Sequence, residues 1–336
     1  MATRAATAHQ LSKEQLVTLL TNMLTQRAVD TRGFQLNRQG KVAIAMGSEG
    51  HEAVQAGAGL AFVRGKDVLY PYYRNTGISL ACGLPIEDLF RSQFARATET
   101  TGGRSIINHA TSRARGIASI SSIIATQCTH AAGAAYAFRF RGENDRAVLC
   151  TFGEGATSEG EWHEAINFSA IHGVPVIWLC ENNQWAISTP ITRQMRNTVV
   201  ADRAAAYGID GVCVDGFDPI AVYDAVRAAR AKAIAGGGPT LIEAKCYRFL
   251  SHTTDDDDRT YRTRDEVETH RSLDPVPRFE QYLIDRNVVV REEIEKLRAE
   301  IAQHVNDVTD SIEAEPLPNP STLYTNVYAG STDAWR

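Results

Sequence analysis

Between residues 146 and 244 the chain alternates short apolar runs with helical stretches. The runs predict strands and the stretches predict helices: strands at 147–152, 174–180, 211–214 and 240–244, and helices at 159–172 and 219–235. Apolar strands flanked by helices are typical of a sheet that is covered on both faces. The pattern therefore predicts an α/β fold with a doubly wound parallel sheet and helices on both faces. Ligands of such sheets bind at the carboxyl ends of the strands.

The ends of the chain have a different pattern. A helix is expected at 11–32, because Ser12 suits the cap position and leucines form an apolar stripe behind it. A charged helical tail follows the polar loop at 252–264, and three prolines mark a break near its end: Pro316, Pro318 and Pro320. We therefore divide the chain into an N-terminal helical segment (1–37), an α/β domain (38–270) and a helical C-terminal tail (271–336).

Composition and charge exclude several classes of protein. The net charge is −5 and the basic residues form no blocks, so neither nucleic acid nor an anionic membrane is an expected partner. No apolar run approaches the roughly 20 residues of a membrane helix, and the first ten residues lack the apolar core of a signal peptide. We expect a cytoplasmic protein. The six cysteines form no CxxC pair, which predicts buried free thiols in a reducing compartment.

Chemistry is expected where the strand at 147–152 runs into Gly153-Glu154-Gly155-Ala156. Glycines there let a phosphate approach backbone N–H groups, and the following helix start adds a favourable dipole. Glu154 would repel such a phosphate unless a divalent cation lies between them. Asn182-Asn183, at the end of the next strand, supplies amide oxygens beside that carboxylate. An oxygen-only set of this kind suits Mg²⁺, so the two strand ends predict one metal-diphosphate site.

A dinucleotide-binding loop is the alternative, with Glu181 as the acid that holds the ribose. Ser158 stands where the third glycine belongs, Glu181 lies beyond the usual distance, and Glu154 would face the pyrophosphate without a metal. These departures favour the magnesium site. A nicotinamide dehydrogenase nevertheless stays open as a hypothesis from a different class.

The sequence resembles the alpha subunits of thiamine diphosphate-dependent 2-oxo acid dehydrogenases over residues 38–330. Their motif, Gly-Asp/Glu-Gly followed some 25 to 30 residues later by Asn-Asn, matches Gly153-Glu154-Gly155 and Asn182-Asn183, with 26 residues (156–181) between them. The flanks GEGATSEGEWHEAINFSA and CENNQWAISTP are most similar to the branched-chain type, 3-methyl-2-oxobutanoate dehydrogenase. The resemblance implies the thiamine diphosphate-binding fold, cofactor contacts at Gly153, Gly155 and Ala156, and magnesium ligands at Glu154, Asn183 and the carbonyl of Trp185.

Two further motifs extend the resemblance. The family's Tyr-Arg pair, which clamps the diphosphate, matches Tyr73 and Arg74. The stretch at 121–127 resembles a segment that frames the pyrimidine of the cofactor, so Ser122 should contact the cofactor and Ile124 should be the wedge that bends it. In some relatives this segment also holds potassium, which implies a potassium site at Ser121, the carbonyl of Ile123, Thr126 and Gln127. Ile123 replaces the family's proline, so the fixed backbone angle of that loop is lost.

Two histidines are expected to be catalytic. His252 matches a histidine on a mobile loop that faces the diphosphate and the reacting carbonyl, and histidine suits proton transfer near neutral pH. We expect this loop to order only when cofactor binds, and its acid run at 255–258 to be solvated. Thr253 replaces a serine that is phosphorylated in some relatives. His109 matches a histidine at the substrate pocket, whereas Ile44 stands in place of an aromatic residue there. Gly50-His51-Glu52-Ala53 resembles a helix start and is expected to be structural.

The resemblance also implies partners. In this family a glutamate of the beta subunit activates the cofactor, so the site should form in an α2β2 heterotetramer that passes the acyl unit to lipoamide on a dihydrolipoyl acyltransferase core. Branched-chain 2-oxo acids are the favoured substrates, Glu181 is more typical of the pyruvate type, and acetoin is a third alternative. A subunit that only supplies scaffold contacts is the non-catalytic hypothesis.

Overall fold

The computed structural model describes residues 11–325 and is built around one parallel sheet. Its five strands lie in the order β1-β2-β3-β7-β6, and every neighbouring pair is parallel. The strands are β1 (Val68–Tyr70), β2 (Val148–Gly153), β3 (Val176–Asn182), β6 (Asp210–Asp215) and β7 (Thr240–Lys245), and a small antiparallel pair, β4 (Trp185–Ala186) and β5 (Thr189–Pro190), follows β3. The prediction of a parallel α/β sheet is confirmed. The sequence analysis did not assign β1 as a strand.

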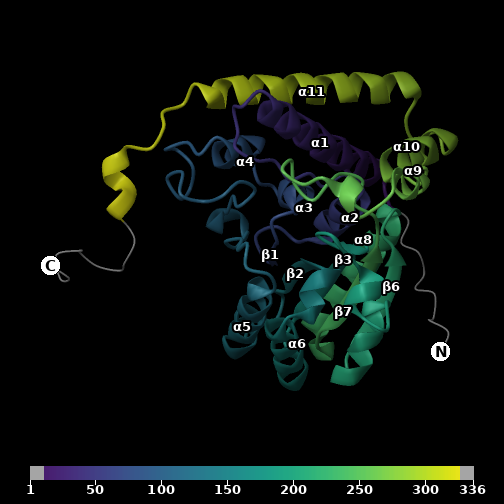
Figure 1. Cartoon of the computed structure of the whole chain (residues 1–336). Coiled ribbons are helices and arrows are strands. Elements are labelled where there is room, and N and C mark those ends of the chain that lie inside the picture. Colours follow the sequence, from purple (N-terminus) through teal and green to yellow (C-terminus); the bar gives the residue numbers. More distant parts are fainter. Residues whose placement is uncertain (1–10, 326–336) are drawn as a thin grey trace.

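Helices cover both faces of this sheet. The α-helices of residues 11–325 are α1 (Lys13–Arg38), α2 (Glu52–Ala61), α3 (Thr76–Ala81), α4 (Ile86–Gln93), α5 (Thr126–Phe140), α6 (Gly160–His172), α7 (Ile191–Gln194), α8 (Pro219–Lys232), α9 (Arg264–Arg271), α10 (Pro275–Asp285) and α11 (Arg291–Glu313). Successive residues of a strand point to opposite faces. Leu149 therefore joins one buried cluster with α1, α2 and α8, whereas Val148 and Cys150 join a second with α5 and α6. Figure 1 shows α1 and α11 on one side of the sheet and α5 and α6 on the other.

The first helix begins as predicted but extends further. Ser12 caps α1 in a capping box with Gln15, each side chain bonding the other's backbone N–H. The helix then continues to Arg38 rather than ending near residue 32, because its inner face packs on α2 and α11. Tertiary contacts of this kind lengthen a helix beyond its apolar stripe. No helix of residues 11–325 is long and apolar enough to cross a membrane.

The strand at the edge of the sheet departs from the sequence analysis. The run at 211–214 was expected to be covered on both faces, but β6 lies at the edge and its residues are exposed or half-exposed. Its Cys213 is therefore exposed, while the other five cysteines are buried free thiols. The prediction that β6 and Cys213 are buried was wrong. An edge strand has a neighbour on one side only, and the local hydrophobicity of a run does not reveal whether it will lie at the edge.

The terminal segments pack onto the α/β core. Residues of α1, α10 and α11 belong to the same buried cluster as the inner face of the sheet. The expected boundaries after residues 37 and 270 fall one residue before the ends of α1 and α9. The helical tail is confirmed as far as the structure describes it, and residues 326–336 of the expected tail lie outside the described residues. Helix α11 ends at Glu313, shortly before the proline-rich break.

Beyond α11 the chain runs along the loop that follows α4. Glu315 accepts from Arg91, its carboxylate to guanidinium distance being 2.8 Å, and from the hydroxyl of Thr98. The N–H of Ala97 donates to the carbonyl of Pro316 at 3.0 Å. The segment after α11 thus holds the start of the loop that leads to His109.

Candidate active site

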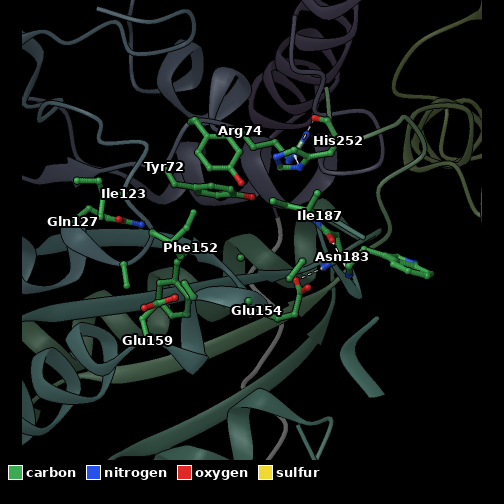
Figure 2. Close-up of a pocket in the computed structure, with 18 of the residues that line it drawn as sticks. Tyr72, Arg74, Ile123, Gln127, Phe152, Glu154, Glu159, Asn183, Ile187 and His252 are labelled. Carbon is green, nitrogen blue, oxygen red and sulfur yellow. Dashed lines mark hydrogen bonds between the residues drawn. The ribbon is translucent and has the colours of Figure 1, made fainter. Parts of the chain in front are cut away.

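A pocket with a cavity volume of about 200 Å³ lies at the carboxyl ends of β2 and β3. In the parallel pairing of these strands Gly153 is opposite Glu181, so Glu154 and Asn183 follow on neighbouring strands at the same edge. Most residues expected to bind cofactor or metal line this pocket: Tyr73, Arg74, Ser121, Ile123, Ile124, Gln127, Gly153, Glu154, Gly155, Ala156, Asn183, Trp185 and His252. Four expected residues do not: Ile44, His109, Ser122 and Thr126. Figure 2 shows Arg74 and His252 on one side and Glu154 and Asn183 on the other.

The glycines of the motif have two different structural roles. A Cβ on Gly155 would lie 2.7 Å from Cβ of Ala186, so the close approach of β4 requires glycine there. A Cβ on Gly153 would meet no atom within 4 Å. The space in front of Gly153 is therefore open for a ligand to approach the backbone, as the sequence analysis expected.

One side of the pocket carries a buried carboxylate without a cation. Glu154 is 1% exposed and begins a short 3-10 helix, Glu154–Ser158. Its Oε2 accepts from the N–H of Asn183 at 3.3 Å, and its Oε1 lies 3.5 Å from Nε2 of Gln194. Burial raises the pKa of Glu154 above its usual value. Within residues 11–325 no basic side chain forms a salt bridge with it.

The oxygens beside Glu154 are those of Asn183 and the turn that follows. Oδ1 of Asn183 accepts from the N–H of Trp185 at 3.0 Å. Gln184, between them, has φ of 70°, a left-handed conformation that is uncommon for a residue other than glycine. The described part of the chain has no group of three or more His, Cys, Asp or Glu side chains that could hold a metal. One carboxylate with amide and carbonyl oxygens is a donor set for a hard cation instead.

The opposite side of the pocket carries two buried arginines. Arg74 donates to the carbonyl of Gly47, and Arg248 donates to the carbonyl of Ile187 at 2.8 Å and to the hydroxyl of Tyr261 at 3.0 Å. Neither guanidinium forms a salt bridge with any carboxylate of the described chain. Burial and the charge of Arg74 lower the pKa of Arg248 to about 10. Two uncompensated cations facing one pocket are an arrangement that favours an anionic ligand.

Arg248 is a site residue that the sequence analysis missed. It lies four residues before His252, in the same segment, and is 1% exposed. Its position between two aromatic residues, Tyr247 and Phe249, was the available signal, but burial cannot be read from the sequence. The structure places it beside Arg74 at the pocket.

Both arginines point at one nitrogen of His252. Nδ1 of that ring lies 3.0 Å from Nη2 of Arg74 and 3.4 Å from Nη1 of Arg248. A guanidinium only donates, so Nδ1 accepts and the proton of the neutral ring is on Nε2. Burial, followed by the charges of Arg74 and Arg248, lowers the pKa of His252 to about 3. The ring of Tyr73 packs edge-on against it with 5.9 Å between centroids.

Part of the acid run holds the His252 loop together. The N–H of His252 donates to Oδ2 of Asp256 at 2.7 Å, and Arg262 pairs with Asp258 at 2.6 Å while donating to the carbonyls of Arg248 and Leu250. Asp255 and Asp257 are exposed. The expectation that the whole run is solvated was therefore wrong for alternate residues, because the loop turns every second carboxylate inward. Whether cofactor is needed to order the loop stays a prediction.

His109 and Ser122 contact each other rather than lining the pocket. Nδ1 of His109 donates to the carbonyl of Ile107 at 2.7 Å, which leaves Nε2 to accept from the hydroxyl of Ser122 at 2.9 Å. Burial lowers the pKa of His109, so its ring is neutral near pH 7. The substrate role of His109 and the cofactor contact of Ser122 stay predictions.

Glu181 lies behind the pocket in a buried network. Its carboxylate accepts from Nδ1 of His51 at 2.6 Å, from Nε2 of Gln55 at 3.0 Å, from the hydroxyl of Tyr72 at 3.3 Å, and from Nδ2 of Asn75. Glu181 is fully buried and does not line the pocket. It therefore has no access to a ribose, which removes the residue on which the dinucleotide hypothesis depended.

Comparison with known proteins places the chain in a family. A sequence profile described as "Dehydrogenase E1 component" matches residues 20–321. The chain belongs to the dehydrogenase E1 component family. Among relatives of this E1-family chain, the "2-oxoisovalerate dehydrogenase subunit alpha" of Bacillus subtilis is 41% identical over 98% of this chain and 100% of that protein. The "3-methyl-2-oxobutanoate dehydrogenase subunit alpha" of Mycobacterium tuberculosis is 38% identical over 96% of this chain and 85% of that protein.

A human relative gives the same assignment. The "2-oxoisovalerate dehydrogenase subunit alpha, mitochondrial" of Homo sapiens is 35% identical over 95% of this chain and 71% of that protein. The resemblance inferred from the two glycine and asparagine motifs is confirmed, and it extends over nearly the whole E1-family chain.

Proposed function

We propose that this chain is the alpha subunit of a thiamine diphosphate-dependent 2-oxo acid dehydrogenase that acts on branched-chain 2-oxo acids. The family supports the class of enzyme, and the names of the relatives support the branched-chain substrates over pyruvate or acetoin. Ile44 stands in place of an aromatic residue at the acyl pocket of the family, so the size of the preferred substrate is tested with a panel of 2-oxo acids.

The distribution of charge in the pocket carries this proposal. Arg74 and Arg248 face it from one side without carboxylate partners, and Glu154 faces it from the other without a cation. A buried charge is costly unless it is paired. A magnesium diphosphate supplies both missing partners at once, because its metal pairs with Glu154 and its anion pairs with the arginines.

Each of these side chains then has a separate task. Arg74, Arg248 and the phenol of Tyr73 bind the diphosphate, while Glu154, Oδ1 of Asn183 and the carbonyl of Trp185 hold Mg²⁺. When bound, thiamine diphosphate supplies the electron sink for decarboxylation. His252 offers its Nε2–H to the pocket as a hydrogen-bond donor, because Nδ1 is engaged by Arg74. Ile124 provides an apolar wall against which the cofactor can bend.

Potassium is a separate prediction. Ser121, Ile123 and Gln127 line the pocket, but Thr126 does not, and Nε2 of Gln127 donates to the carbonyl of Thr151 at 3.0 Å. A rise in melting temperature in KCl that equal NaCl does not give would support a potassium site. Equal melting temperatures in the two salts would remove it from the proposal.

The partners follow from what this chain lacks. The activating glutamate of the family belongs to a beta subunit, so we propose an α2β2 assembly that transfers the acyl unit to a dihydrolipoyl acyltransferase core. Three apolar side chains at the rim of the pocket are exposed in this single chain: Ile123 by 70%, Ile124 by 41% and Ile187 by 54%. Exposed apolar groups around a binding pocket favour a second protein surface over it.

Reconstitution tests the function. The chain is co-expressed with its matched beta subunit, and decarboxylation of a panel of 2-oxo acids is followed with and without Mg²⁺ and thiamine diphosphate. We expect activity that needs both, with branched-chain acids preferred, and none from this chain alone. Full turnover by the isolated chain would contradict the proposal.

The rival classes have their own outcomes. Binding of NAD without metal, measured by titration calorimetry, would favour the nicotinamide dehydrogenase. Unchanged activity of the complex after Glu154→Ala and His252→Ala would favour a scaffold subunit.

A further inference from the structure

The side-chain amide of Asn183 contacts a buried histidine, His51, that does not line the pocket. Nδ2 of Asn183 lies 3.3 Å from Nε2 of His51, and Nδ1 of His51 lies 2.6 Å from Oε2 of Glu181. His51 and Glu181 are fully buried, and Asn183 is 5% exposed. His51 is the N-cap residue of α2, far from Asn183 in the sequence. The proposed function uses neither His51 nor Glu181.

The chemistry of the three groups fixes the direction of each hydrogen bond. A carboxylate only accepts, so Nδ1 of His51 carries the proton toward Glu181. Oδ1 of Asn183 accepts from the N–H of Trp185, so the amide atom that faces Nε2 of His51 is Nδ2, which only donates. Nε2 of His51 therefore offers a lone pair. That lone pair can accept from the amide N–H of Asn183 but would repel the amide oxygen. The nitrogen of Asn183 therefore points to His51, and its Oδ1 points away.

Glu181 is itself immobilised. Gln55, Tyr72 and Asn75 donate to its carboxylate along with His51. A buried carboxylate with four donors has no low-energy alternative rotamer, since rotation would leave donors without partners. The fixed carboxylate fixes the tautomer of His51, which in turn fixes the amide of Asn183.

We propose that His51 and Glu181 are positioning residues that set the amide orientation of Asn183 so that its oxygen, rather than its nitrogen, faces the magnesium ion. This inference rests on the proposed function, in which Asn183 is a metal ligand. Partners behind a ligand typically account for about 10- to 100-fold in metal affinity. It also gives His51, expected from the sequence to be structural only, a role at the site.

Metal affinity is the direct measurement. Mn²⁺ is titrated into the chain in complex with its matched beta subunit in the presence of thiamine diphosphate, and free Mn²⁺ is followed by electron paramagnetic resonance. We expect His51→Leu to weaken Mn²⁺ binding by about 10- to 100-fold. His51→Gln should keep most of the affinity, because its Oε1 can accept from Asn183 while its Nε2 donates to Glu181. His163→Leu is the matched control, since that exposed histidine contacts Tyr207 outside the pocket.

The outcomes separate the inference from the function on which it rests. Wild-type affinity in His51→Leu, or equal loss in His51→Leu and His51→Gln, would overturn the positioning role while leaving the proposed function intact. Absence of Mn²⁺ binding by the wild-type complex would overturn the proposed function and this role together.

A second measurement does not depend on whether His51→Leu folds. Nitrogen-15 spectra of histidine-labelled wild-type chain, with the His51 signal identified by its loss in His51→Gln, report the tautomer. We expect the proton on Nδ1. A proton on Nε2 would exclude acceptance from Asn183 and refute the inference.

Discussion

Nη2 of Arg74 lies 3.0 Å from Nδ1 of His252, so the residue proposed to clamp the diphosphate sets the tautomer of a proposed catalytic one. Because the arginine can only donate, the imidazole proton is on Nε2. The same arginine charge opposes protonation of the ring. Binding of an anion between Arg74 and Arg248 would therefore change the environment of His252 as well as filling the pocket.

The depressed pKa of His252 predicts a pH dependence of stability. Its pKa is about 3 in the folded chain, below the ordinary value of 6.5, so between these values the unfolded state binds a proton that the folded state does not. The contribution of this group to stability is complete above pH 6.5 and is lost as the pH falls toward 3. Melting temperatures of the cofactor-free chain should fall more steeply between pH 7 and pH 5 in the wild type than in His252→Gln. Parallel curves would contradict the assigned environment.

Removing the guanidinium of Arg248 should weaken cofactor binding. Hydrogen bonds to charged groups contribute about 1.5–3 kcal/mol, so Arg248→Met is expected to raise the dissociation constant for thiamine diphosphate by about 10- to 100-fold. The dissociation constant of Arg248→Lys should lie between those of the wild type and Arg248→Met, because lysine keeps the positive charge but lacks the planar guanidinium. Arg32→Met, which removes a guanidinium that contacts Thr309 and Asp310, is the control. Titration calorimetry in constant Mg²⁺ measures the effect, and equal affinity in all four proteins would contradict it.

Glu154→Gln should separate stability from cofactor binding. The carboxylate is buried without a cation, so its neutral isostere should leave the melting temperature of the cofactor-free chain unchanged or higher. The rise in melting temperature that Mg²⁺ and thiamine diphosphate give the wild-type complex should be lost, since that rise depends on binding to the folded state. Differential scanning fluorimetry measures both quantities.

Glu243→Gln is the contrasting variant for that experiment. Glu243 is also buried, but it accepts from Nδ2 of Asn182 at 2.6 Å and from the N–H of Ala201 at 2.9 Å. The two bonds use different oxygens of the carboxylate, and the amide nitrogen of glutamine cannot accept the bond of the oxygen that it replaces, so we expect destabilisation of about 1–3 kcal/mol. A loss of stability in Glu154→Gln as large as in Glu243→Gln would contradict the proposal that Glu154 is an unpaired carboxylate that binds a metal.

Glu315→Ala should loosen the loop that leads to His109. The carboxylate contacts Arg91 and Thr98, and these partners hold its pKa below the usual range. Hydrogen exchange of amides at 94–105 is expected to speed up, while amides of β2 and β3 keep wild-type protection. In the wild type the same loosening should appear at acidic pH, because the contact is lost as the pH falls through the lowered pKa of Glu315. Unchanged exchange at 94–105 would show that this contact does not restrain the loop.

Local pattern predicted the central strands of the sheet but its two edge strands only in part. The apolar runs predicted β2, β3 and β7, because strands that are covered on both faces consist mostly of apolar residues. β1, three residues long, was not predicted, and β6 was predicted as a strand but with both faces covered, because a short strand needs no apolar run and an edge strand can be exposed. Pairing with β2 forms β1, and pairing with β7 alone places β6 at the edge of the sheet.

Motif spacing on its own predicted only the residues near strand ends, whereas Tyr73, Arg74 and His252, which also line the pocket, were expected from the resemblance to the family. Glu154 and Asn183 lie in motifs whose spacing implies neighbouring parallel strands, and the structure places them together. Arg248 and His51 carry no such spacing, and their contribution depends on contacts with Arg74, Asn183 and Glu181.

The sequence by itself therefore determined the α/β class, the family, and the acidic side of the pocket, because these depend on residue types at short separations along the chain. The tertiary structure decided which charges lack partners, which tautomer His252 and His51 adopt, and which way the side-chain amide of Asn183 points. Those properties depend on burial and on donors brought together from distant segments, and neither is encoded in any local stretch of the chain.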